Sequence, residues 1–72
     1  MRDKQAKFRE LAESRVNRAL NDIRLIGNLA NRNNYEYSEE EATKIIAALE
    51  GEVKGLKSKF QIEFQKRREF KL

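Results

Sequence analysis

The chain has 72 residues, a formal net charge of +4, no proline and only three glycines, and its charged and hydrophobic residues each make up 39% of the total. It contains no cysteine and no histidine, which excludes disulfides, the usual zinc sites, cysteine nucleophiles and histidine general bases. The composition is typical of a single helical domain. Because a core of this size supplies roughly 3–5 kcal/mol at most, we expect further stability to come from oligomerisation or unusually regular helix packing.

The first helical pattern runs from about residue 3 to about residue 31. Its apolar residues recur at steps of three and four, which is the spacing of one helix face. Leu25 and Leu29 lie outside this face, about 90–120° from its centre at about 100° per residue. We therefore expect another protein surface to cover these two leucines. The residues of the first stripe are Phe8, Ala12, Val16, Ala19, Ile23, Ile26 and Ala30.

A polar connection follows, with a predicted turn at about 32–37. The segment from Asn31 to Asn34 cannot continue an apolar stripe. Asparagine tolerates the left-handed backbone conformation, so an asparagine in that conformation is expected at the end of the first helix. Ser38 followed by Glu41 matches a capping box, in which the two residues exchange hydrogen bonds. This pattern predicts that a second helix begins at Ser38.

The second helical pattern runs from about residue 38 to about residue 67, and its apolar residues nearly follow a heptad repeat. They are Ala42, Ile46, Leu49, Val53, Leu56 and Phe60. Two such helices with a short connection predict an all-α antiparallel two-helix hairpin, in which Ile26 faces Ile46 and Ala19 faces Val53. We expect self-association, as a homodimer, or docking on a partner protein to complete the hairpin into a four-helix bundle. One continuous helix is the alternative, and the asparagine cluster argues against it.

Polar and aromatic side chains gather around the predicted turn. Amide and guanidinium groups form hydrogen bonds with peptide backbones or base edges, and tyrosines often anchor interfaces. The alternative interpretation is a helix cap with a plain connection, whose tyrosines fold onto the end of the bundle. The candidate partner-binding residues are Leu25, Asn28, Leu29, Arg32, Asn34, Tyr35 and Tyr37.

The same stretch carries a resemblance. The run Arg24-Leu25-Ile26-Gly27-Asn28-Leu29, followed by Asn31-Arg32 and Tyr35-Glu36-Tyr37, is similar to a segment of small uncharacterised helical proteins from bacteria and mobile elements. The similarity covers about residues 15–60. It implies a compact helical module in a bacterial or phage setting, and it brings no activity to this chain.

Basic residues concentrate toward both ends of the chain. Residues 38–53 carry a net charge of −4, whereas residues 54–72 carry +5. Because an antiparallel hairpin would bring both ends together, these residues predict nucleic-acid binding as an alternative function. Two other interpretations explain the same pattern. Either the basic residues belong to a solvated helix face with pairs such as Glu63–Arg67, or they bind an acidic protein partner. The candidates are Lys4, Lys7, Lys57, Lys59, Lys66, Arg67, Arg68 and Lys71.

The sequence predicts a small non-enzymatic interaction module, such as an accessory or inhibitory subunit that docks on a larger protein. It shows no metal-ligand spacing, glycine-rich phosphate loop or nucleophile–base pair, so we expect no catalytic residue, metal or cofactor. No apolar run approaches 18 residues, and the segment MRDKQAKFRE is charged throughout. We therefore expect no membrane span, no signal peptide and a cytoplasmic location.

Overall fold

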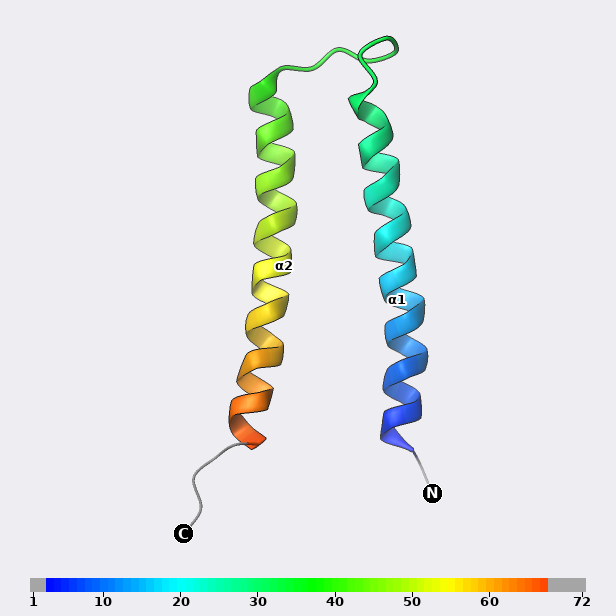
Figure 1. The fold of residues 1–72 in the computed structure, drawn as a ribbon, viewed down its shortest axis with the longest axis vertical. Helices are drawn as coiled ribbons and strands as arrows, with labels where there is room; N and C mark the ends of the chain where they lie inside the picture. The colour runs from blue at the N-terminus through cyan, green and yellow to red at the C-terminus, as the bar shows by residue number, and fades with distance from the viewer. Residues whose placement is uncertain (1–2, 68–72) are drawn as a thin grey trace. The chain divides into compact units, whose positions relative to one another are not determined.

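The computed structural model describes residues 3–67, and the regular structure within that range is helical, with no strand (Figure 1). Helix α1 spans Lys4–Gly27, the 3-10 turn η1 spans Asn28–Ala30, and helix α2 spans Glu39–Arg67. The expected all-α class is confirmed for these residues. The chain divides into two units, Met1–Glu36 and Tyr37–Leu72, and each is described by itself.

Asp3 caps the start of α1. Its Oδ1 accepts hydrogen bonds from the backbone N–H groups of Gln5 at 3.0 Å and Ala6 at 3.2 Å. The backbone of Asp3 is extended, with φ −98° and ψ 102°, as is usual for an N-cap residue. The cap satisfies two N–H groups that have no partner within the helix.

The first helix ends in two stages rather than running unbroken to about residue 31. The N–H of Asn28 is shared between the carbonyl oxygens of Arg24 and Leu25, so the hydrogen bonding tightens and continues as η1. Gly27 and Asn28 both have low helix propensity, which favours a break here.

The prediction of a left-handed asparagine at the end of the first helix is wrong, because no residue in the described range has a positive φ. Asn28 is right-handed, with φ −65° and ψ −20°, and Asn31 is extended, with φ −69° and ψ 104°. The tighter turn satisfies carbonyl groups at the helix end without a left-handed residue.

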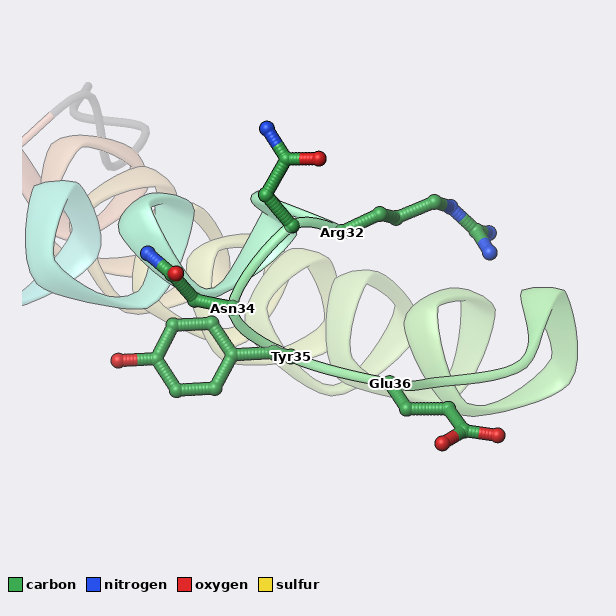
Figure 2. A pocket seen from close by; sticks show the side chains of 5 residues that line it. Arg32, Asn34, Tyr35 and Glu36 are labelled. Carbon is green, nitrogen blue, oxygen red and sulfur yellow. The ribbon is translucent and has the colours of Figure 1, made fainter.

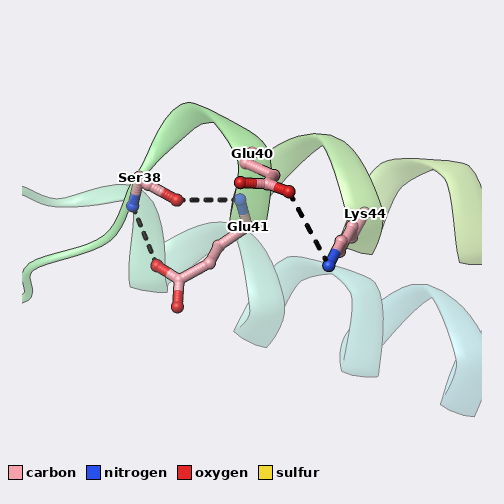
Figure 3. A network of polar contacts seen from close by, with 4 residues as sticks. All are labelled: Ser38, Glu40, Glu41 and Lys44. Carbon is pink, nitrogen blue, oxygen red and sulfur yellow. Dashed lines mark hydrogen bonds and ion pairs between the residues drawn. The ribbon is translucent and has the colours of Figure 1, made fainter.

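The capping box at the start of α2 is confirmed (Figure 3). Ser38 Oγ accepts a hydrogen bond from the N–H of Glu41 at 3.0 Å, and Glu41 Oε1 accepts one from the N–H of Ser38 at 2.9 Å. One turn further, Lys44 Nζ lies 3.9 Å from Glu40 Oε2. Negative charge in the first turn is also favoured by the helix dipole. Helix α2 therefore begins where the sequence pattern predicts.

The apolar stripes of both helices are accessible to solvent, and no described residue is buried. On α2, Ile46 is 53% exposed and Val53 is 60% exposed. Amphipathic helices in water gain most of their stability by packing this kind of face against another surface. The pairing of Ile26 with Ile46 concerns the placement of one unit against the other, and it stays a prediction. Neither α1 nor α2, within the described residues, combines the length and apolar character needed to cross a membrane.

Candidate functional site

Asn31 organises the turn that follows η1. Its Oδ1 accepts a hydrogen bond from the N–H of Asn33 at 2.9 Å. Its carbonyl oxygen accepts hydrogen bonds from the N–H groups of Asn34 at 3.1 Å and Tyr35 at 3.0 Å. The side-chain bond is that of an Asx turn. Because three hydrogen bonds converge on one residue, the backbone of residues 31–35 has a defined course.

Asn31 lies in the polar cluster of the predicted turn but is not one of the candidate site residues. The signal that identifies its role is an asparagine two residues before another turn residue, which is the spacing of an Asx turn. Asn31 supports the turn through its hydrogen bonds, whereas Arg32 and Tyr35 supply exposed side chains beside it. The residue that holds the backbone of the turn therefore lies beside the residues whose side chains are available for contact.

Residues 32–36 line a shallow surface hollow of about 350 Å³. Figure 2 shows that the side chains of Arg32 and Tyr35 extend in opposite directions and that the carboxylate of Glu36 points away from the tyrosine ring. Small-molecule sites usually surround their ligand with convergent groups. A divergent arrangement is better suited to contact with a broad protein surface than to enclosure of a small ligand.

Large side chains near this turn lie exposed in the first unit. The exposed fractions are 55% for Leu25, 47% for Leu29 and 49% for Tyr35. Leu25 belongs to α1, whereas Leu29 belongs to η1. The angle expected for Leu29 assumed a continuous α-helix and does not apply, because a 3-10 helix has about 3.0 residues per turn.

The other candidate residues of the turn divide between the two units. Asn28 begins η1 with its N–H bonded back to α1, and Asn34 lines the shallow hollow. Tyr37 belongs to the second unit and is partly exposed. The structure therefore brings Arg32, Asn34 and Tyr35 together around one hollow, and it places Tyr37 in the other unit.

The basic candidates do not form one continuous face on α2. Lys57 and Lys59 are both exposed, but a two-residue separation puts them about 160° apart around the helix. Lys66 Nζ lies 3.3 Å from Glu63 Oε2, so it is partnered at i,i+3. The side chain of Arg67, the other partner expected for Glu63, is not among those described.

On α1 the two lysine candidates share a face. Lys4 and Lys7 are exposed and lie about 60° apart around the helix. The expectation that they share one end with the basic residues of α2 depends on the hairpin and stays a prediction. Arg68 and Lys71 lie outside the described residues.

Carboxylates of the second unit take part in local helical contacts. Glu41 belongs to the capping box, Glu40 lies near Lys44, and Glu63 pairs with Lys66. In the described part of the chain, no three or more potential metal-binding side chains lie in one group.

Comparisons with known proteins found no matching family model, no matching curated protein and no matching solved structure.

Proposed function

We propose that this chain is a small, non-enzymatic interaction module that docks on a larger protein as an accessory or inhibitory subunit. The observation that carries the proposal is the exposure of Leu25, Leu29 and Tyr35 near a turn whose backbone is held by Asn31. Tyrosine and arginine are the residue types most often found as binding hot spots, and Arg32 lies in the same turn. The sequence resemblance supports a bacterial or phage setting, and a cytoplasmic location is part of the proposal.

A turn with a defined backbone suits docking on energetic grounds. Association costs free energy whenever loops and side chains must become ordered at the interface. Hydrogen bonds from Asn33, Asn34 and Tyr35 to Asn31 already order this backbone before a partner arrives. Binding through residues 31–35 therefore loses less conformational entropy than binding through an unstructured loop.

The apolar stripes of α1 and α2 also need a surface to pack against. We infer that α1 and α2 pack as an antiparallel hairpin and that a second copy or a partner protein completes a four-helix bundle. The support is the exposed apolar stripe on each helix and the volume match of the expected pairs, with small Ala19 facing Val53.

Nucleic-acid binding is the second candidate. The observation that favours it is the exposure of Lys4 and Lys7 on one face of α1, together with a net charge of +5 in residues 54–72. Binding through several phosphate contacts weakens by orders of magnitude between low and moderate salt, because counterions are released. Docking through leucine and tyrosine side chains responds much less to salt.

A capture experiment separates the two functions. The tagged full chain is incubated with bacterial lysate, with and without nuclease, at low and at moderate salt. The proposal expects a defined protein to be retained in every condition. A different result supports the second candidate and contradicts protein docking. In that result nucleic acid is recovered at low salt but lost at moderate salt, and the captured protein is lost after nuclease treatment.

A further inference from the structure

The apolar residues of the α2 stripe have the same spacing whether they are counted from the N-terminal or the C-terminal end of the helix. The six positions of the stripe are placed symmetrically about Gly51. If a second α2 lies antiparallel with Gly51 of both copies at the same level, every stripe residue faces another stripe residue. The pairs are then Ala42 with Phe60, Ile46 with Leu56, and Leu49 with Val53.

This register also matches side-chain volumes. It places the small Ala42 opposite the large Phe60 at both ends of the stripe, and residues of similar size meet at its centre. A parallel pairing would instead place Ala42 on Ala42 and Phe60 on Phe60, leaving a gap at one level and crowding at the other. Facing large with small residues is the arrangement that fills a helix–helix interface.

The charge of α2 favours the same orientation. Residues 38–53 carry a net charge of −4, whereas residues 54–66 contain four lysines and only Glu63. An antiparallel neighbour puts the acidic half of one helix beside the basic half of the other, and a parallel neighbour puts like charges together. Glu41 and Lys59 lie on the same flank of the stripe at about 100° per residue, and the proposed register places them near one another across the interface.

Two acidic residues oppose this pairing. Glu50 and Glu52 flank the centre of the stripe, where each would lie near its own counterpart in the second copy. Like charges that face one another destabilise an interface. Their position predicts that self-association strengthens when either one is neutralised.

We propose that α2 is a self-association surface whose occupant is a second copy of this chain, antiparallel and centred on Gly51. Four of the six stripe residues are between 45% and 60% exposed, and they are Ile46, Val53, Leu56 and Phe60. The other two, Ala42 and Leu49, are partly exposed. The inference rests on the bundle part of the proposed function and names what completes it. In a four-helix bundle each core layer takes a residue from every helix, so a stripe residue of α2 meets both α1 of its own chain and α2 of the second copy. It is independent of docking through the turn, which belongs to residues 1–36.

Engineered cysteines test the register, because the chain has no cysteine of its own. Full-length Leu49→Cys and Val53→Cys proteins are mixed in a glutathione redox buffer, and each is also oxidised alone. The proposal expects the mixed disulfide to exceed each homodisulfide by about tenfold or more, because a disulfide tolerates only a short separation of its Cα atoms. Ala42→Cys mixed with Val53→Cys is the mismatched control and should cross-link poorly. Predominant homodisulfides would overturn the register.

Sedimentation equilibrium of the unmodified chain at micromolar concentration provides a second test. The proposal expects a mass of twice the 8.5 kDa chain. Lys59→Glu should raise the dimer dissociation constant severalfold more than Lys44→Glu, which makes the same charge change about 160° from the centre of the stripe. The control is matched, because each substitution places two glutamates four residues apart, with Glu63 and Glu40 respectively. Equal effects, or the mass of a single chain, would overturn the proposal without touching the capture experiment on the turn.

Discussion

Removal of the Ser38 hydroxyl tests how much of α2 depends on its capping box. Ser38 Oγ accepts a hydrogen bond from the N–H of Glu41 at 3.0 Å, and Ser38→Ala leaves that N–H without its partner in the protein. Loss of a serine N-cap costs about 1 kcal/mol, with a range of roughly 0.5–2 kcal/mol. For a chain of this size, about 1 kcal/mol lowers the melting temperature by about 4–8 °C.

The assay is thermal unfolding followed by circular dichroism at one fixed protein concentration. Ser38→Asp is the matched control, because a carboxylate also accepts from the N–H of residue 41 and suits the positive end of the helix dipole. We expect Ser38→Ala to melt at lower temperature and Ser38→Asp to melt close to the original protein. If both variants melt like the original chain, the capping box does not contribute to stability and the reasoning is wrong.

Three further predictions concern local structure. Gly51→Ala and Gly55→Ala should each raise the free energy of unfolding by up to about 1 kcal/mol, because alanine favours helix. An added Cβ at either position has open space around it, apart from the helix's own nearby residues. A lower melting temperature of either variant would show that a neighbouring surface requires the glycine. Asn31→Ala should speed amide exchange at Asn33 by removing its 2.9 Å acceptor, whereas Asn31→Asp should preserve protection; equal exchange in both variants would contradict the Asx turn. Asp3→Ala should reduce protection in the first turn of α1 and Asp3→Ser should keep it, as measured by hydrogen exchange, and unchanged protection in the alanine variant would argue against this cap.

Features decided by a few neighbouring residues were accessible from the sequence. The capping box is one, because Ser38 and Glu41 satisfy each other's N–H groups without any distant contact. The end of α1 was predicted less well, since glycine and asparagine signal a break but do not specify its hydrogen bonding. The chain uses the tight turn η1 where a left-handed residue was expected.

The candidate site shows the same division between local and distant information. The clustering of Arg32, Asn34 and Tyr35 followed from their adjacency, whereas the supporting role of Asn31 appeared only with its three hydrogen bonds. What covers Leu25, Leu29 and the helical stripes depends on surfaces far away in sequence or on other molecules. Periodicity identifies an apolar face but does not identify the surface that packs on it.

Docking through the turn is tested most directly by the affinity of the Arg32→Ala/Tyr35→Ala double variant for the captured partner. Truncation of hot-spot residues costs about 2 kcal/mol or more, which is roughly thirtyfold in affinity. Both side chains are exposed, so we expect the helicity and melting temperature of the variant to match those of the original chain. The account predicts binding weakened by about thirtyfold or more in a normally folded protein. Unimpaired binding by the folded double variant would contradict it and would move the site of interaction to the basic residues.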